Sequence, residues 1–430
     1  MNRQQNSGVY DCGPINNKLE RFLVSKVICY LLPEANVYLD FEGTNINDGL
    51  QNSGTIKIQP PRLLDLLWIL TNPSKKFPEA FVDGRWCCKP EELTKLILLF
   101  KNQKVEKTRH NGLLLGLDAY LIHVYKQYLS SSERRKVRNH YNQDPRFYEK
   151  VIGKNLVYSC AFFQEGNESL EVAQTRKIET TLSRLKLPAN TKSKPEVLDI
   201  GCGWGGFIFH CNNLINANFT GISISISQVD FANQKLNAIP NNGKNCSFHC
   251  VDYKNWRIGE SNLYDGIVSI GMLEHVGKTE YINFFREVSR LLKPGCRAVI
   301  HSITRRDTGV TNPWIDKYIF PGGYIPRVSE VIRNIEDSGM VLLACHRHEG
   351  VNYQKTLRCW LDNLLSNQIH CMDIIESNIR ESSSWNNEKI AYESKRVFRI
   401  WIFYLASIQM IFDHEFGSCD VTQFVISNLN

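Results

Sequence analysis

The chain lacks the cysteine spacing of a metal-binding or disulfide-stapled protein. Its 430 residues include 14 cysteines, yet no Cys-x-x-Cys pair occurs. Cys87 and Cys88 are adjacent, and Cys246 and Cys250 are four positions apart. This spacing excludes the common structural zinc patterns, and without an export signal it does not indicate a disulfide framework. We therefore expect no metal site, and reduced thiols scattered through a cytoplasmic chain.

Long hydrophobic runs are also scarce. Residues 1–19 are polar and Asn-rich, without the apolar core of a signal peptide, and we expect residues 1–20 to be a disordered tail. The longest apolar stretch, residues 398–412, is interrupted by Arg399, Ser407 and Gln409. It falls short of the roughly 20 residues that a membrane-spanning helix needs. The sequence therefore predicts a buried or amphipathic C-terminal helix and no transmembrane segment.

A strong overall excess of one charge is missing as well, because the net charge is only +7. The excess is local: residues 101–138 hold nine Lys or Arg against three acids, and they flank an apolar, helix-like run at residues 112–125. A basic-flanked apolar helix suits an anionic lipid surface, and a solvated linker between domains is an equal alternative. No aromatic-and-basic stacking motif accompanies the charge, so nucleic acid is not expected as a partner.

The most informative segment that is present is residues 197–206. An apolar run ends in Asp199 and continues into Gly201, Gly203 and Gly205, an Asp-x-Gly-x-Gly-x-Gly pattern. The pattern predicts a buried parallel strand that turns sharply into a helix, where glycine allows a positive φ and close approach of a ligand. The helix N-terminus that follows can hold an anionic group. The spacing differs from that of dinucleotide folds, and we interpret it as a site for S-adenosylmethionine.

Strand and helix segments alternate regularly after residue 196. The expected strands are residues 197–200, 219–224, 247–251, 266–270 and 297–301, with helices such as 227–237 and 278–292 between them. The alternation predicts an α/β fold with a doubly wound parallel sheet, which binds ligands at the carboxyl ends of its strands. We expect the tail to be followed by a small α+β domain (21–100), a basic linker (101–136) and a catalytic domain (137–430).

Six segments together resemble one family, the cyclopropane-fatty-acyl-phospholipid synthases and mycolic acid cyclopropane synthases. The matching segments are residues 158–163, 197–206, 221–228, 269–277, 312–322 and 352–360. The resemblance covers residues 137–430. Residues 77–86 are more weakly similar to the small, lipid-associated N-terminal domain of the bacterial phospholipid enzymes. It implies a mostly parallel, seven-stranded, Rossmann-like methyltransferase sheet.

The resemblance implies transfer of a methylene group from S-adenosylmethionine across a cis double bond of a phospholipid acyl chain. In the family the alkene attacks the sulfonium methyl, and a bound bicarbonate removes a proton from the carbocation as the cyclopropane ring closes. The positions that match the bicarbonate holders are Cys160, Glu274, His301 and Tyr353, with the backbone of Ile303 nearby. Thiol, imidazole and phenol groups can donate to a small anion, and Glu274 can accept from its hydroxyl.

For the methyl donor, the resemblance assigns positions at the strand ends and in the segment before the first strand. These are Tyr158, Ser159, Asp199, Gly201, Gly203, Ser223, Gln228, Asp252 and Tyr253. Asp252 can accept a hydrogen bond from an adenine amino group, and Tyr253 can stack beside the ring. The aromatic side chains Trp314, Tyr318 and Phe320 are candidates for stabilising a carbocation, with core packing as an equal alternative.

Three positions depart from the family pattern. Residues 140–148 contain Asn142 in place of a carboxylate, and Asp144-Pro145 in place of a flexible Gly-Asn turn, which puts lid behaviour over the donor site in question. Ser223 replaces a threonine, and Ile408 stands where bacterial enzymes have a cysteine. We infer that no thiol nucleophile acts at position 408.

Alternative functions stay open from the sequence. The same donor site would serve a lipid C-methyltransferase that leaves the ring open, or a small-molecule N-methyltransferase. Cys160, His301 and Tyr353 argue against amine methylation, because a nitrogen nucleophile creates no carbocation to deprotonate. A non-catalytic lipid-binding protein would need neither Glu274 nor the glycine loop. The expected partner is a membrane phospholipid with unsaturated acyl chains, contacted peripherally, and related enzymes suggest a homodimer.

Overall fold

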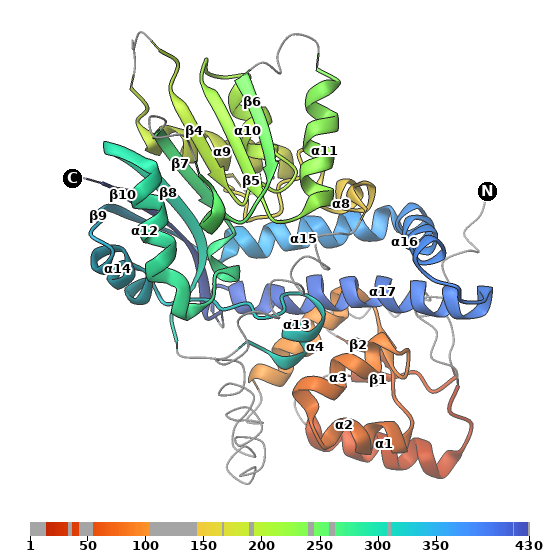
Figure 1. Cartoon of the computed structure of the whole chain (residues 1–430). Helices are drawn as coiled ribbons and strands as arrows, with labels where there is room; N and C mark the ends of the chain where they lie inside the picture. The colour runs from red at the N-terminus through yellow and green to blue at the C-terminus, as the bar shows by residue number, and fades with distance from the viewer. Residues whose placement is uncertain are drawn as a thin grey trace. The chain divides into compact units, whose positions relative to one another are not determined.

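The computed structural model describes residues 14–32, 37–42, 55–102, 144–165, 167–188, 193–239, 245–257, 263–307, 311–415 and 417–428. The chain divides into two compact units (Figure 1). The first contains the described residues up to 102 together with Asn312–Ile319 and Gln368–Met410, and the second contains the remainder. The expected apolar helix at 112–125, most of the basic linker and Asn142 lie outside the described residues.

The second unit is built on a seven-stranded sheet with the order β6-β5-β4-β7-β8-β10-β9 (Figure 1). Its strands are β4 (Glu196–Ile200), β5 (Asn218–Ser223), β6 (Cys246–Cys250), β7 (Tyr264–Ile270), β8 (Leu292–Arg305), β9 (Val341–His348) and β10 (Cys419–Ser427). Strands β4 to β8 are parallel, whereas β10 is antiparallel to both of its neighbours. The predicted fold class is confirmed, and each expected strand is present within a few residues of its predicted bounds.

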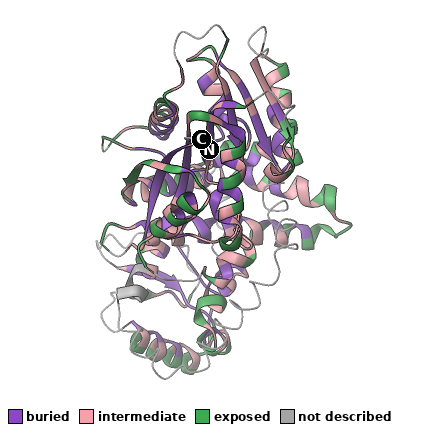
Figure 2. Ribbon diagram, turned by 60° about the vertical axis from the view of Figure 1, so that its left-hand side comes forward, coloured by how far each residue is buried: buried purple, intermediate pink, exposed green. Residues whose placement is uncertain are grey.

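Helices pack on both faces of this sheet. They are α9 (Leu170–Leu185), α10 (Gly206–Asn212), α11 (Ile226–Asn237), α12 (Tyr281–Leu291) and α14 (Val328–Asp337). Two further helices of this unit, α8 (Pro145–Ile152) and α15 (Val351–Ser366), pack against each other. Leu198 and Ile200 of β4 join a core with α12 and α14, whereas Val197 joins a second core with α9, α10 and α11. Figure 2 shows the strands mainly as buried residues. Burial on both faces explains why these strands are apolar at successive positions.

The first unit combines a three-stranded sheet with helices from distant parts of the chain. Strand β2 (Ile56–Gln59) lies between β1 (Val37–Leu39), which is parallel to it, and β3 (Cys87–Cys88), which is antiparallel. The helices are α1 (Lys18–Leu31), α2 (Leu63–Leu70), α3 (Pro73–Val82), α4 (Pro90–Asn102), α13 (Pro313–Tyr318), α16 (Gln368–Ser382) and α17 (Asn387–Ile408). The N-terminal residues thus have the expected α+β character.

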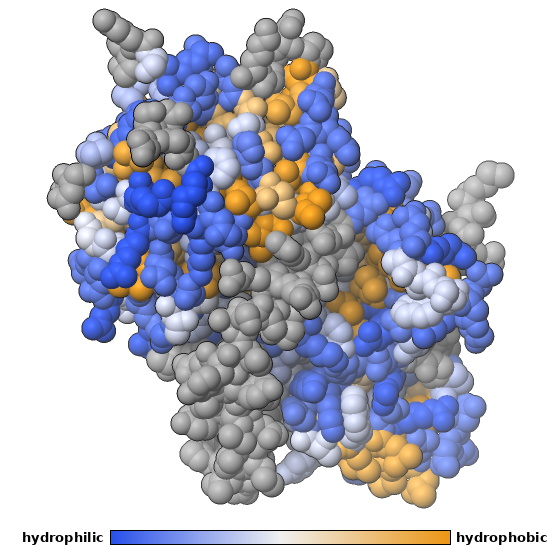
Figure 3. All heavy atoms as spheres, viewed as in Figure 1, coloured by the Kyte–Doolittle hydropathy of each residue, from blue (hydrophilic) through white to orange (hydrophobic). Residues whose placement is uncertain are grey.

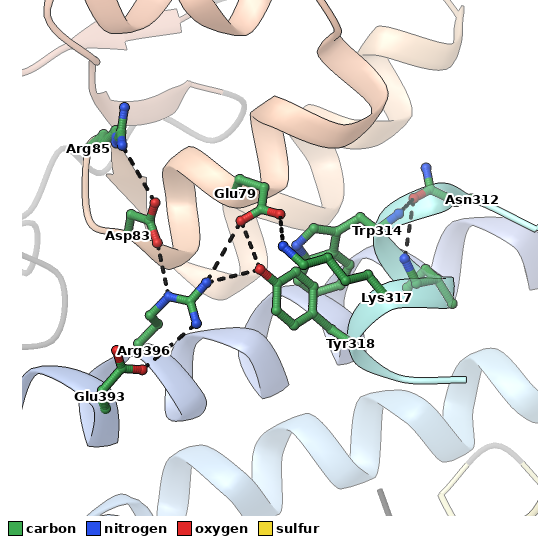
Figure 4. A network of polar contacts seen from close by, with 10 residues as sticks. Glu79, Asp83, Arg85, Asn312, Trp314, Lys317, Tyr318, Glu393 and Arg396 are labelled. Atoms are coloured by element: carbon green, nitrogen blue, oxygen red, sulfur yellow. Dashed lines mark hydrogen bonds and ion pairs between the residues drawn. The ribbon is translucent and has the colours of Figure 1, made fainter. Parts of the chain in front are cut away.

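Helix α17 shares a core and a polar network with the N-terminal residues. The ring of Phe403 lies 5.5 Å from that of Phe81, and Arg396 donates to Asp83 Oδ1 over 3.0 Å (Figure 4). The expected catalytic domain, 137–430, therefore does not pack as one body, because α13, α16 and α17 belong to the first unit. The expected buried helix near residues 398–412 is present as the second half of α17.

Residues 14–20, which belong to the expected disordered tail, are ordered, and residues 1–13 lie outside the described residues. Helix α1 begins at Lys18, and Ile15 is already buried. Asn17 Oδ1 accepts hydrogen bonds from the backbone N–H groups of Leu19 (2.9 Å) and Glu20 (3.2 Å), which caps the helix. The expectation of disorder is wrong for residues 14–20, because the Asn-rich composition supplies a helix cap there. Within the described residues, no helix combines the length and hydropathy required to cross a bilayer.

Candidate functional site

The glycine loop lies at the carboxyl end of β4. The backbone N–H groups of Gly201 and Cys202 donate to the carbonyl of Ile222 on β5, over 2.9 and 3.1 Å. Gly201 has φ +85°, and a Cβ there would lie 2.8 Å from Met272 Cγ. Gly203 has φ +56°, and a Cβ there would meet nothing within 4 Å. The loop thus needs glycine for its conformation at both positions, and at Gly203 it leaves open space beside the backbone.

The ends of β5 and β6 place further polar groups at the same edge of the sheet. Ser223 Oγ donates to Gln228 Oε1 over 3.0 Å, and both side chains are buried. The N–H of Val251 donates to the carbonyl of Ser223 over 2.9 Å, so the segment after β6 is bound to the end of β5. Asp252 caps a short 3₁₀ turn, and the ring of Tyr253 follows it. Four residues that are predicted to bind the methyl donor therefore lie at two neighbouring strand ends: Ser223, Gln228, Asp252 and Tyr253.

Helix α8 packs beside the glycine loop. The ring of Tyr148 lies 4.4 Å from that of Trp204 in the loop and 5.6 Å from that of Tyr158. The helix starts at Pro145, and Asp144 Oδ1 accepts from the N–H of Arg146 over 2.8 Å. Asp144-Pro145 is thus a cap followed by the favoured first helical residue. This departure from the family pattern replaces a turn with a helix start.

Residues 158–163 are bound to α15, so two of the motifs that are far apart in the sequence meet. The N–H of Ala161 donates to Thr356 Oγ1 over 3.0 Å, and that of Phe163 donates to Asn352 Oδ1 over 2.7 Å. The ring of Tyr158 lies 5.1 Å from that of Trp360, also on α15. The predicted residues Tyr158, Ser159 and Cys160 are therefore held next to the helix that carries Tyr353.

Two of the predicted anion-holding side chains, Cys160 and Tyr353, are buried. Cys160 is buried, and desolvation raises the pKa of its thiol, which donates to the carbonyl of Ala161 over 3.2 Å. Tyr353 is buried as well, with its ring 4.5 Å from that of Phe412. A protonated thiol and a phenol can both donate a hydrogen bond without adding a charge.

Glu274 is a buried carboxyl group. One of its oxygens accepts a hydrogen bond, and the other has no described partner. The N–H of Ile303 on β8 donates to Oε1 over 2.7 Å. Among the described residues, nothing bonds the buried Oε2. Burial raises the pKa of Glu274 to about 7, and the bond from Ile303 opposes that shift. The backbone of Ile303 therefore orients Glu274 through one oxygen and leaves the other available to a ligand.

His301 lies two residues before Ile303 on β8, and only 2% of its surface is exposed. Its Nδ1 is 3.1 Å from Nε2 of Gln423, the residue opposite it on β10. Desolvation, followed by the positive charge of Lys177, lowers its pKa well below the usual range, so the ring is neutral. The carbonyl of His301 accepts from the N–H of Gly271 over 2.9 Å, which ties β8 to the segment that leads to Glu274.

Sequence reasoning missed Lys177, a fully buried lysine on α9. Its Nζ donates to Ser159 Oγ over 2.8 Å. Burial lowers the pKa of Lys177 and raises that of Asp199, and the attraction between their charges opposes both shifts. Gln174, three residues earlier on α9, donates to the carbonyl of Ser159 over 2.9 Å. Their spacing of three residues, beside the apolar Ala173 and Ile178, was the available signal that they face inward.

The three aromatic candidates do not share one environment. Trp314 and Tyr318 belong to the first unit, and Phe320 belongs to the second. Tyr318 Oη donates to Glu79 Oε2 over 2.9 Å and accepts from Arg396 over 2.9 Å (Figure 4). Trp314 is fully buried. Packing and hydrogen bonding within the first unit thus account for Trp314 and Tyr318.

The residues present fit both small groups that the resemblance implies. A glycine loop with open space and three polar strand ends suits a nucleoside-containing methyl donor. Neutral donors, together with a carboxylate oxygen that lacks a described partner, suit a small oxyanion that carries a hydroxyl. In the described part of the chain, no cluster of His, Cys, Asp or Glu could hold a metal ion.

A model of the family "Mycolic acid cyclopropane synthetase" matches residues 128–424. The chain is 30% identical over 311 residues to the cyclopropane-fatty-acyl-phospholipid synthase of Escherichia coli, which covers 69% of this chain and 74% of that protein. It is 26% identical over 374 residues to the sphingolipid C9-methyltransferase of Komagataella phaffii, covering 83% and 71%. A solved mycolic acid cyclopropane synthase, complexed with SAH and CTAB, is 25% identical with a TM-score of 0.56 and covers 68% of this chain and 98% of that one. This chain therefore belongs to the mycolic acid cyclopropane synthetase family.

Proposed function

We propose that the chain transfers a methylene group from S-adenosylmethionine across a cis double bond of a phospholipid acyl chain, forming a cyclopropane ring. The observation that carries the proposal is buried Glu274, whose Oε2 lacks a described partner, in the unit that also holds the neutral donors Cys160 and His301. A relative at 30% identity is named for this reaction. Methylation of an amine forms no carbocation, so an enzyme of that kind needs no bound anion to take a proton from the transferred carbon.

We assign the methyl donor to the edge formed by β4, β5 and β6. The backbone of Gly201 and Gly203 would lie against it, and Ser223 and Gln228 would hydrogen-bond its hydroxyl groups. Asp252 would accept from the adenine amino group, with Tyr253 stacked beside the ring. Tyr158 and Ser159 would complete the site, and Asp199 would orient the glycine loop.

We assign bicarbonate to the pocket of Cys160, Glu274, His301 and Tyr353. When bound, it would supply the base that takes a proton from the transferred carbon. Cys160, His301 and Tyr353 would donate hydrogen bonds to it, and Glu274 Oε2 would accept from its hydroxyl, which strengthens it as a base. Burial keeps water away from a carbocation, which water would otherwise trap.

We further propose that one face of the first unit contacts the membrane. Leu19, Phe22, Leu23 and Tyr30 follow one exposed side of α1, and Leu64, Leu67 and Leu70 are exposed on α2; we name this set the α1–α2 face. Glu20 Oε1 accepts from the N–H of Leu63 over 3.0 Å, which joins the two helices. An apolar patch covers this part of the molecule (Figure 3). Exposed Lys18, Lys26 and Arg62 lie among these residues, and apolar residues with basic neighbours suit an anionic phospholipid surface.

Flotation of the protein with vesicles of anionic phospholipid tests the α1–α2 face. The double variant Phe22→Ser, Leu64→Ser removes two side chains that are 57% and 79% exposed. It should bind vesicles several-fold more weakly, because less apolar area enters the membrane. Leu214→Ser, at an exposed position of the second unit, is the matched control and should bind normally. Equal binding by both variants would contradict the assignment.

The test of the reaction is mass spectrometry of unsaturated phospholipid vesicles incubated with the protein and methyl-deuterated S-adenosylmethionine. Cyclopropanation adds the methyl carbon and retains two of its three deuterium atoms, because one leaves as the proton. A methyl-branched, still unsaturated product with all three, formed when the carbocation loses a proton from a neighbouring chain carbon, would instead show lipid C-methylation; the Komagataella phaffii relative is named as a sphingolipid C9-methyltransferase. Unlabelled lipid, with donor still bound, would favour a small-molecule N-methyltransferase.

A further inference from the structure

A chain of buried hydrogen bonds runs from α9 through β10 to His301. Arg184 on α9 donates to Gln423 Oε1, and Gln423 Nε2 lies 2.8 Å from Thr181 Oγ1 and 3.1 Å from His301 Nδ1. We propose that Arg184, Thr181 and Gln423 are positioning residues that hold His301 as the tautomer with its proton on Nε2. Of these four hydrogen-bonded residues, only His301 belongs to the site described above.

The orientation of the Gln423 amide follows from its neighbours. A guanidinium group carries only donors, so the atom that faces Arg184 must be the amide oxygen. Thr181 Oγ1 donates its single proton to the carbonyl of Lys177 over 2.7 Å, so towards Gln423 it can only accept. Both neighbours therefore require the same orientation, with the Gln423 NH₂ group facing Thr181 and His301.

The tautomer of His301 then follows. Because the Gln423 NH₂ group donates, Nδ1 of the neutral ring must accept, and the ring proton must be on Nε2. Nε2 has no hydrogen-bond partner among the described residues, so its N–H is available to a ligand. With the proposed function, on which this step rests, that N–H is the donor that faces bicarbonate. The other tautomer would present a lone pair to the anion and repel it.

His348 offers an internal comparison. Arg184 lies 3.3 Å from its Nε2, and because Arg184 can only donate, this nitrogen must accept. Burial lowers the pKa of His348 to about 4, so it too is neutral, with its proton on Nδ1. Both rings stack on that of Phe162, with centroid distances of 5.8 Å for His301 and 3.8 Å for His348. The contacts of Arg184 therefore predict opposite tautomers, with the proton on Nε2 in His301 and on Nδ1 in His348.

Nitrogen-15 NMR of histidine-labelled protein reads the tautomers directly and requires neither substrate nor bicarbonate. Signals are assigned by their loss in His301→Asn and His348→Asn. We expect a protonated Nε2 for His301 and a protonated Nδ1 for His348. In Gln423→Glu the carboxylate can only accept, so Nδ1 of His301 should become protonated while His348 is unchanged. A wild-type His301 with its proton on Nδ1, or no change in Gln423→Glu, would overturn the proposal.

Gln423→Met provides a second variant if the glutamate variant does not fold. It removes the donor without adding a charge, so both tautomers of His301 should become populated. Gln409→Met is the matched control, because Gln409 is also buried but donates to the carbonyl of Leu405 in the first unit. It should leave the His301 signals unchanged. Retention of the pure Nε2–H tautomer in Gln423→Met would contradict the proposed role of Gln423.

Activity measurements separate this role from simple packing. In Gln423→Met, which leaves part of His301 as the Nε2–H tautomer, kcat should fall several-fold. In Gln423→Glu it should fall on the order of 10²-fold, the usual cost of losing one preorganised donor, while KM for S-adenosylmethionine stays unchanged in both. Added bicarbonate should restore part of the loss, because a weakened anion site is filled at higher concentration. A tautomer shift with unchanged kcat would leave the hydrogen-bond chain in place and instead contradict the proposed use of His301 in catalysis.

Discussion

The site that we propose for the methyl donor (the donor edge) and the one that we propose for bicarbonate (the anion pocket) lie in the same unit but are assembled differently. At the donor edge, Ser223 bonds Gln228 five residues away, and the loop glycines directly follow their strand. In the pocket, Glu274 is held by Ile303, 29 residues away, and His301 by Gln423, 122 residues away. A site built from neighbours in sequence can be recognised from its motif, whereas a site built across strands depends on register. Variants should therefore separate donor binding from turnover.

Glu274→Gln should produce the largest effect. It keeps the bond from Ile303 but removes the carboxylate, so turnover should fall by about 10²- to 10⁴-fold, the usual contribution of acid–base catalysis. Calorimetric affinity for S-adenosylhomocysteine should stay within a few-fold, because the donor edge is intact. Glu287→Gln, an exchange of a carboxylate that pairs with Arg290 on α12, is the control and should be active. A normally active Glu274→Gln would contradict the assignment of the base site.

The ionisation of Glu274 should make turnover sensitive to pH. Its pKa is raised from 4.5 to about 7 by burial, so activity that needs the carboxylate should fall as pH drops through about 7. The folded protein binds this proton more tightly than the unfolded chain does. The stabilising contribution is therefore complete below about pH 4.5 and is lost as pH rises through about 7.

Infrared difference spectroscopy can follow this group directly. A protonated-carboxyl band should disappear between pH 6 and pH 8 in the wild type. Burial raises the pKa of Asp199 to about 7 as well, so Glu274→Gln should lose one component of the band and keep that of Asp199. If the band is absent at pH 6, or is unchanged by the substitution, the raised pKa does not belong to Glu274.

Unlike Glu274→Gln, Gly201→Ala should weaken binding of the methyl donor. A Cβ at Gly201 would lie 2.8 Å from Met272 Cγ, with φ at +85°. We expect a stability loss of about 1–3 kcal/mol from the strained backbone, and at least a tenfold lower affinity for S-adenosylhomocysteine. Gly339→Ala shares the positive φ (+83°) but meets no atom within 4 Å. It should lose stability without losing affinity, and equal affinity losses in both variants would refute the local explanation.

Ser223→Ala should give the smallest effect. The substitution removes one buried hydroxyl, worth about 1 kcal/mol, so donor affinity should fall about fivefold with kcat nearly unchanged. Ser427→Ala removes a comparable buried hydroxyl that bonds Cys296 at the end of β10, and it should bind the donor normally. If kcat falls more than affinity in Ser223→Ala, the two sites are not separable as the comparison assumes.

The sheet was largely predictable because its determinants are local. Alternation of apolar strands and helices placed β4, β5, β6, β7 and β8 within a few residues of their observed bounds. The sequence did not predict β9 or β10, of which β10 runs antiparallel to its neighbours, because no motif marks the point at which the chain reverses direction in the sheet. Their placement matters, since β10 puts Gln423 opposite His301.

The sequence by itself determined the turn after β4, because its glycines allow the positive φ that the turn has, and it predicted that residues at successive strand ends lie together. Only the tertiary structure decided that Lys177 is buried against Ser159, and that α13, α16 and α17 pack with the N-terminal residues. It also decided that Arg184 and Gln423 face His301. The physical reason is that φ preferences and hydrophobic periodicity act over a few residues, whereas strand register and helix packing join groups that are more than a hundred residues apart.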